Sequence, residues 1–478
     1  MTDTRVISRP GWADLISGGN LLRSLALSGG VALHAVNLYV STTILPSVVR
    51  EIGGLDYYAW NTTLFVIASI LGAALSSPVL TQAGPRAGYG IAAVIFMAGS
   101  LICAGSNAMP IMLVGRFVQG FGGGILLALA YAMVRRVYAE PLWPRALALL
   151  SSMWGMATLL GPAVGGAFAE LGLWRGAFLA LLPFAGLVAI AAFFVLPRRD
   201  VDRKIAEPLP VIQLGLLTLA VFAASWGGVG DGVASTVAGM LAALILIAVL
   251  VVVERASKKR LLPADTFKLP GALGSLYATS ALLAVTVTCT EIFLPLFLQE
   301  LHGRSPLEAG YIAAVMSAGW TAAAIFASGF QAERRDIAVR AGPVLSLAAM
   351  AVLAAVLPVA GPAGDWLPLA FICAALVVGG AGVGLAYPHL SAMVLRVAPP
   401  GEADNAASSI MTVQLCATAF GAAIAGLAVN LAGASSSSAD MNAAHAARWL
   451  FVTVAAAPSL CIIVMRGRSF RKATSHSR

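Results

Sequence analysis

The sequence is dominated by about fourteen apolar segments, each close to twenty residues long. About 20 apolar residues in a helix are enough to cross the hydrocarbon core of a bilayer. Hydrophobic residues make up 59% of the 478 residues and charged residues 11%, whereas a soluble domain carries about 25% charge. Because no soluble core could bury this much apolar surface, we expect an all-α integral membrane protein. The expected spans are 26–49, 58–82, 87–106, 109–134, 146–169, 175–196, 210–228, 233–253, 274–299, 307–330, 339–360, 366–388, 405–431 and 448–465.

The basic residues are divided between alternate loops as this span count requires. If the N-terminus is cytoplasmic, 25 of the 30 Lys and Arg residues fall in the cytoplasmic loops and tails. The outside loops hold Arg50, Arg175, Arg304 and Arg448, and Arg116 lies within a span. Cytoplasmic loops of membrane proteins carry such an excess, so we expect a bacterial inner (plasma) membrane protein with both termini in the cytoplasm. The net charge of +9 then faces anionic lipid, and we expect no nucleic-acid partner.

Two charged stretches divide the chain into two halves. Six spans precede the stretch "PRRDVDRKIAEPL", six follow "ERASKKRLLPADTFKLPG", and two spans lie between them. Two similar bundles that face each other are the plan of many secondary transporters. We expect a cytoplasmic tail at 1–25, a six-helix bundle at 26–196, linkers with two extra spans at 197–271, a second six-helix bundle at 272–466, and a cytoplasmic tail at 467–478.

The stretch "GPAVGG" at 161–166 is unusual for the middle of a helix. In lipid a helix tolerates an internal proline, because neighbouring helices and local backbone adjustments satisfy the freed carbonyl groups. Glycines allow a second helix to approach closely. The fifth span is therefore expected to be a closely packed helix near a bundle interface, and a packing role alone is the alternative. The residues concerned are Gly155, Gly161, Pro162, Gly165 and Gly166.

Several motifs resemble those of a known family. The fifth-span pattern "GxxxxxGPxxGG" resembles the antiporter motif of the major facilitator superfamily, and "LVGRFVQGFGGG" (113–124) resembles its fourth-span motif, with Arg116 and Gln119 at matching places. "LWRGAFLALLP" (173–183) resembles the start of the sixth span in that superfamily's drug:proton antiporters, and "FLPLFLQELHGRSPLEAGY" (293–311) resembles the end of their ninth span. Together with the span count, they resemble the fourteen-span drug:proton antiporter branch. The resemblance implies a major facilitator fold that works by alternating access and exports solutes in exchange for protons.

Two positions depart from the pattern of that branch. Its first span usually carries an aspartate where "VNLYVSTTILP" (36–46) has Asn37, and its loop between spans two and three usually carries an aspartate where this chain has Thr81. The first change removes one possible proton carrier. The second removes a gating contact at the inside face. Both departures favour a specialised substrate over ordinary drug:proton exchange.

Two charged residues within spans are candidates for proton coupling. An arginine at mid-membrane costs about 2.5–3.5 kcal/mol on insertion scales, so we expect Arg116 to have a role that offsets this cost. The fourth-span resemblance implies that it organises proton or substrate charge, together with Gln119; a side chain that snorkels to the outer headgroups is the alternative. Glu291 lies in the ninth span, and a carboxyl group shielded from water can carry a proton. The alternative is a glutamic acid that stays neutral and bonded to a neighbour.

A polar face and several aromatic residues are candidates for the substrate site. His34, Asn37 and Ser41 recur at helical spacing on the first span, and a polar stripe on an apolar span is expected to face a water-filled cavity. A neutral, hydrogen-bonded histidine is the simpler interpretation of His34. Six aromatic residues could form walls for a planar solute, although each could equally serve packing or the interface belt. They are Tyr39, Trp60, Phe117, Trp154, Trp320 and Tyr387.

These features predict a secondary active transporter for a small organic solute, coupled to protons. Multidrug-like export competes with uptake of a specific aromatic metabolite or vitamin such as riboflavin. The chain has no HExxH, no GxSxG and no clustered histidines, so we expect no enzyme activity, no metal site and no cofactor. The expected partners are the solute, protons and the lipid bilayer, and we expect a monomer. The short tails disfavour a sensor with an output domain.

Overall fold

The computed structural model describes residues 13–139, 142–198, 210–227, 233–257, 260–263, 266–267, 271–327, 330, 332–359, 366–399, 402–432 and 439–467. Within these ranges, thirteen helices are long and apolar enough to cross a membrane, and α9 (Val211–Gly227) is a further apolar helix of 17 residues. The predicted all-α membrane fold with about fourteen spans is confirmed. Much of the predicted tails and linkers falls on residues outside the described ranges.

Twelve of the spans form two six-helix bundles. The first contains α2 (Gly18–Ile52), α3 (Trp60–Gln82), α4 (Gly84–Ala104), α5 (Met109–Val137), α6 (Trp143–Glu170), and a sixth span made of α7 (Trp174–Leu179) and α8 (Leu181–Val195). The second contains α11 (Ala272–His302), α12 (Pro306–Ala327), α13 (Ala332–Val356), α14 (Leu367–Val397), α15 (Ala403–Leu431), and a sixth span made of α16 (Ala439–Val454) and α17 (Ala456–Arg466). The extra helices α9 and α10 (Val233–Ala256) come between the bundles along the chain, and short helices α1 (Ala13–Ile16) and η1 (Leu55–Tyr57) flank α2.

Glycines allow close helix packing at equivalent places in the two bundles. On α5, a Cβ atom at Gly120 would lie 2.2 Å from the carbonyl oxygen of Phe65 on α3. On α14, a Cβ atom at Gly384 would lie 2.2 Å from the carbonyl oxygen of Trp320 on α12. Only glycine permits backbones to approach so closely. The second and fourth spans of each bundle are therefore joined in the same way, as expected for two related bundles.

Several helices extend beyond the apolar segments that predict them. The α14 helix continues through Pro388 to Val397, well past the expected end of the twelfth span at residue 388. An internal proline does not end a membrane helix when neighbouring helices stabilise the bend. The α2 helix likewise begins at Gly18 and contains Pro46. Hydropathy marks the part of each helix that lies in lipid, whereas the helix itself continues into the polar region.

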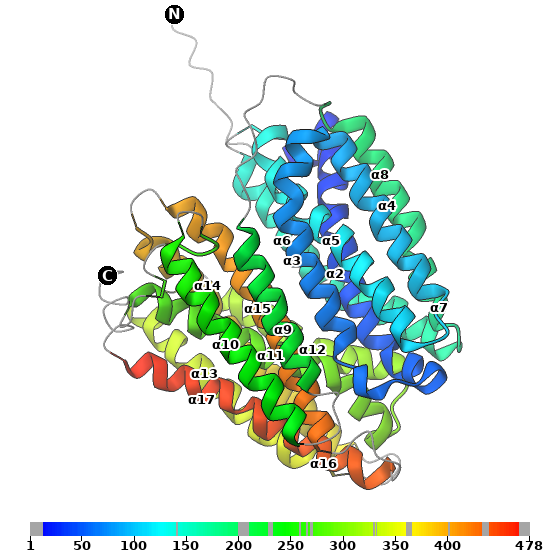
Figure 1. Ribbon diagram of the computed structural model, residues 1–478, viewed down its shortest axis with the longest axis vertical. Helices are drawn as coiled ribbons and strands as arrows, with labels where there is room; N and C mark the ends of the chain where they lie inside the picture. Colours follow the sequence, from blue (N-terminus) through cyan, green and yellow to red (C-terminus); the bar gives the residue numbers. More distant parts are fainter. Residues whose placement is uncertain are drawn as a thin grey trace, which may run out of the picture.

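The two bundles meet at one end and diverge at the other (Figure 1). We call the end where α8 stops and α9 starts the linker end, and the other the opposite end. At the opposite end, Arg50 of α2 donates a 2.7 Å hydrogen bond to Gln299 of α11, and Asn430 of α15 donates a 2.9 Å bond to the carbonyl oxygen of Asp56. Toward the linker end the bundles separate in Figure 1. The structure therefore has the opposite end closed.

The extra helices form a hairpin beside the junction of the bundles. The α9 helix packs on α10 and also contacts α3 of the first bundle and α15 of the second. The α10 helix is mostly exposed apart from its contact with α9, since only 17% of its most apolar stretch is buried within the protein. The hairpin thus lies at the periphery of the helical assembly, where one helix touches both bundles.

Candidate functional site

Arg116 lies inside the first bundle rather than at its surface. Its side chain is fully buried and its guanidinium stacks over the Phe65 ring at 4.2 Å, a cation–π contact. Its Nε donates to the carbonyl oxygen of Asn61 at 3.2 Å and one terminal nitrogen donates to Gln119 at 2.5 Å. The side chain does not snorkel to the headgroups. Its hydrogen-bond partners within the described chain are all neutral.

A chain of hydrogen bonds fixes the orientation of this arginine. Gln119 accepts from Arg116 and donates through Nε2 to the Ser100 hydroxyl of α4 at 2.8 Å. Asn61 of α3 donates to the Ser41 hydroxyl of α2 at 2.8 Å. Four helices of the first bundle therefore hold one cation. The second terminal nitrogen of Arg116 has no hydrogen-bond partner among the described residues.

The polar face of the first span points into the same bundle. His34 lies against Phe65 and Trp154, with ring centroids 5.1 Å and 5.9 Å away, and Asn37 is fully buried. The Nδ1 atom of His34 and both polar side-chain atoms of Asn37 lack hydrogen-bond partners in the described part of the chain. Buried polar groups almost always have a partner in protein or water. This unsatisfied face is therefore suited to bind water or a solute.

Glu291 lies where the two bundles meet. It is on α11, about 16 Å from the end of the helix at 1.5 Å per residue, and it accepts a 2.6 Å hydrogen bond from the Ser317 hydroxyl of α12. The Tyr39 hydroxyl of α2 faces both Glu291 and Ser317. A carboxyl group of one bundle thus interacts electrostatically with an aromatic hydroxyl of the other. The sequence-predicted acid and aromatic residue are brought together, whereas Arg116 is held separately within the first bundle.

The glycine-rich motif of α6 lies against both bundles. A Cβ atom at Gly161 would lie 2.2 Å from the Tyr39 Cβ of α2, and one at Gly166 would lie 2.5 Å from the Leu307 Cα of α12. Pro162 approaches Gly310 of α12 in the same region. The motif therefore permits close contact on two sides at once.

The other two glycines of the motif differ from each other. A Cβ atom at Gly165 would lie 2.8 Å from the carbonyl oxygen of Val40, so this glycine also allows α2 to approach. A Cβ atom at Gly155 would meet nothing within 4 Å. Close packing therefore explains four of the five motif residues and leaves Gly155, nearer the linker end, without such a role.

The six candidate aromatic residues are spread over several places. Trp154 contacts His34 in the first bundle, and Trp320 lies 5.4 Å from Tyr387 in the second. Trp60 packs edge-on against Phe222 of α9 at 5.5 Å. Phe117 is a partly buried side chain of the core, and Tyr39 faces Glu291. They do not make one continuous wall.

Sequence reasoning missed several residues that complete the site. Ser317, Asn61 and Ser100 hold Glu291, Arg116 and Gln119 in place. Each is a small polar residue in an apolar span, which is the available signal, but such residues are common. Which of them meets a charged partner depends on the register between helices, and the sequence does not show this.

Comparisons with known proteins agree with this architecture. The model of the Major Facilitator Superfamily matches residues 27–422. A probable multidrug-efflux transporter of Mycobacterium tuberculosis (strain ATCC 25618 / H37Rv) is 36% identical over 429 residues, which cover 88% of this chain and 90% of that protein. A multidrug transporter of Bacillus subtilis (strain 168) is 27% identical over 306 residues, covering 61% of this chain and 55% of that one.

Solved structures show the same fold at low sequence identity. A peptide transporter in complex with sulfate matches with a TM-score of 0.68 and 14% identity, over 97% of each chain. A bacterial homologue of the human lysosomal transporter Spinster matches with a TM-score of 0.61 and 14% identity, over 95% of this chain and 96% of that one. With the sequence matches, these show a membrane transporter rather than an enzyme. This chain belongs to the Major Facilitator Superfamily.

Proposed function

We propose that this transporter exports a small organic solute from the cytoplasm by alternating access, in exchange for protons. The observation that carries the proposal is the position of Glu291 between the bundles, in contact with Ser317 of its own bundle and facing Tyr39 of the other. The Mycobacterium tuberculosis relative, which is named as a probable multidrug-efflux transporter, supports the direction. The linker end is the cytoplasmic end in this proposal, as the distribution of basic residues indicates.

Glu291 is suited to couple a proton to movement of the bundles. A carboxyl group away from bulk water binds a proton more readily than one in water, and a neighbouring hydrogen bond stabilises its charged form. When the bundles part at the opposite end, Tyr39 moves away from Glu291 and water reaches the carboxyl group. The proton affinity of Glu291 therefore changes with the conformation, which is the requirement for coupling.

The first bundle is proposed to supply the solute site. One terminal nitrogen of Arg116 and both polar side-chain atoms of Asn37 are buried donors and acceptors without a partner in the part of the chain that the structure describes. With asparagine in place of the family's aspartate, this bundle offers a positive charge and an amide but no first-span acid. Hydrogen-bond acceptors on the solute, such as carbonyl groups, would satisfy these groups.

The experiment measures accumulation of a panel of solutes in cells with and without the protein. The panel contains cationic dyes and riboflavin, and each solute is measured before and after the proton gradient is collapsed. Export predicts lower accumulation that rises to the level of cells without the protein on collapse. Higher accumulation of a single compound would contradict export and indicate an uptake carrier. Riboflavin is the candidate substrate for such a carrier.

Two substitutions connect the result to the site. Glu291→Gln is expected to abolish gradient-driven export while the protein remains in the membrane at normal amount, and the matched control Glu308→Gln, an exposed acid on α12, is expected to export normally. Arg116→Ala is expected to lose export as well. Undiminished export by Glu291→Gln would remove this residue from the mechanism.

A further inference from the structure

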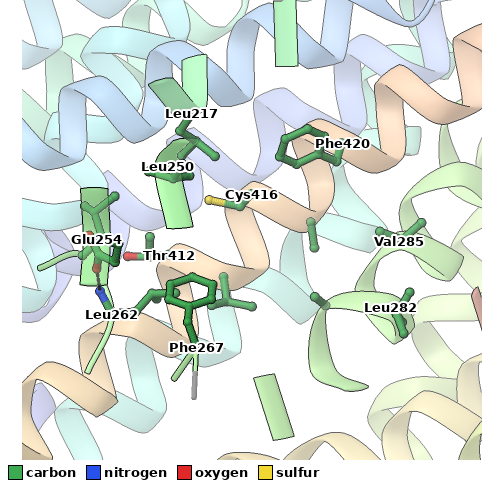
Figure 2. Close-up of a pocket in the computed structure, with 14 residues that line it drawn as sticks. Leu217, Leu250, Glu254, Leu262, Phe267, Leu282, Val285, Thr412, Cys416 and Phe420 are labelled. Carbon is green, nitrogen blue, oxygen red and sulfur yellow. Dashed lines mark hydrogen bonds between the residues drawn. The ribbon is translucent and has the colours of Figure 1, made fainter. Parts of the chain in front are cut away.

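An apolar cavity lies beside the extra helices, away from the candidate transport residues. It has a volume of about 260 Å³ and is lined by 14 residues from α9, α10, the segment after α10, α11 and α15. Figure 2 shows Leu217 and Leu250 on the extra helices, Cys416 and Phe420 on α15, and Val285 on α11. None of the candidate transport residues lines it. The lining is almost wholly apolar, so the cavity is suited to an apolar group.

One carboxylate is placed at the edge of this apolar cavity. Glu254, in the last turn of α10, is 3% exposed. One of its oxygens accepts a 2.7 Å hydrogen bond from the backbone N–H of Leu262 (Figure 2). The other oxygen is buried with no well-formed hydrogen bond among the described residues, although the Leu261 backbone N–H and the Gln213 side chain lie within hydrogen-bonding reach of the carboxyl group and the positive charge of Arg260 acts on it. A buried carboxylate oxygen without a partner is costly, so a donor from a bound molecule would satisfy it.

The burial of Glu254 is unexpected from the sequence around it, because basic residues follow it along the chain. The segment "VERASKKR" places basic residues directly after this acid, and these could pair with it in solvent. The Glu254 side chain instead turns to the cavity. The Arg260 guanidinium donates to the backbone oxygen of Ser257 at 3.0 Å, and its side chain is exposed. Among the described residues, Arg260 is exposed, and the cavity lining contains one acid, Glu254, and no basic side chain.

The shape and charge together define the ligand. Pockets for drug-sized ligands measure about 300–1,000 Å³, so this cavity suits one or two rings or a short alkyl chain. A protonated amine attached to such a group would donate to the unpaired oxygen of Glu254 and balance its charge. An anionic group would be repelled by the same carboxylate.

We propose that the cavity between the extra helices and α11 and α15 is a binding site for amphipathic amines, with the apolar group among Leu250, Val285 and Phe420 and the ammonium on Glu254. The amine can come from a free solute or from the headgroup of phosphatidylethanolamine. This site is separate from the transport site, and its occupancy does not depend on the direction or coupling of transport.

The test compares two ligands with the same apolar body. Binding of 2-naphthylmethylamine and of 2-naphthalenemethanol to the purified full chain in detergent is measured by equilibrium dialysis. The amine is expected to bind at least tenfold more tightly than the alcohol. Glu254→Gln is expected to reduce amine affinity to that of the alcohol, while the control Glu308→Gln leaves it unchanged. Equal affinity of the two ligands for the unaltered protein would overturn the proposal.

Two further measurements locate the ligand and do not depend on Glu254. Ala281→Phe fills part of the cavity and is expected to weaken both ligands, with a monodisperse size-exclusion profile as the check of folding. The amine is expected to protect Cys416 from N-ethylmaleimide, read by peptide mass spectrometry, but not Cys373 on α14. Protection of neither cysteine, or of both equally, would place the ligand elsewhere.

The source of the amine is distinguished by lipid competition. Phosphatidylethanolamine added to the micelles competes with 2-naphthylmethylamine if the lipid headgroup is the natural ligand, while phosphatidylglycerol does not. Absence of competition by phosphatidylethanolamine assigns the site to free amines. Competition by phosphatidylglycerol alone would contradict the carboxylate's role.

Discussion

Replacement of Gly166 with alanine tests whether close contact of α6 with α12 holds the opposite end closed. A Cβ atom there would lie 2.5 Å from the Cα and 2.8 Å from the Cδ1 of Leu307. Favourable carbon–carbon contacts need about 3.5–4.0 Å, so the two helices must separate by about 1 Å. Overpacking of this kind costs about 1–3 kcal/mol. Since 1.4 kcal/mol is a factor of ten, the closed arrangement is expected to lose about 5- to 150-fold in population.

The assay measures the distance between the bundles at the opposite end. Spin labels at Leu173, next to α7, and Glu300, on α11, report this distance by double electron–electron resonance in a background without reactive native cysteines. Gly166→Ala is expected to increase the fraction of long distances. Gly155→Ala is the matched control on the same helix, because its Cβ atom would meet nothing within 4 Å. Identical distance distributions for the two variants would refute the reasoning.

Three further substitutions test the packing and the polar site. Asn37→Val removes two buried polar atoms that have no partner among the described residues. Since each such group costs about 1–3 kcal/mol, the thermal unfolding midpoint in detergent should stay level or rise while transport falls; a lower midpoint would contradict this. Phe178→Ala removes a fully buried ring and should cost about 3–5 kcal/mol, seen as a clearly lower midpoint. Arg175→Ala breaks a pair with Glu51 in which both side chains are over one-third exposed, and because exposed pairs contribute little, an unchanged midpoint is expected; a large decrease would argue for a structural role of this pair.

The number and order of the spans could be predicted because lipid imposes a strong and local constraint. Each crossing needs about 20 apolar residues whatever the tertiary structure. Helix ends were less predictable. The α14 helix passes through Pro388 and continues for nine residues beyond the expected end at residue 388, since a proline bend is stabilised by neighbouring helices that the local sequence does not reveal.

The candidate site could be predicted only where its contacts are local. Arg116 and Gln119 are three residues apart on one helix, so their hydrogen bond follows from helical spacing. The hydrogen bond of Glu291 with Ser317 joins two different spans, and the electrostatic interaction of Tyr39 with Glu291 joins the two bundles. Such pairings depend on helix register and bundle orientation. The unpaired amide of Asn37 likewise becomes visible only when all its neighbours are placed.

The most direct test of proton-coupled export uses the purified protein in lipid vesicles that contain a pH-sensitive dye. A solute identified in the cell assay is added on one side without any imposed proton gradient. The account predicts that solute moving into the vesicle drives protons out, so the lumen becomes alkaline, and that Glu291→Gln abolishes the change while Glu308→Gln retains it. Solute uptake with no change of luminal pH, or with acidification, would contradict the exchange of solute for protons.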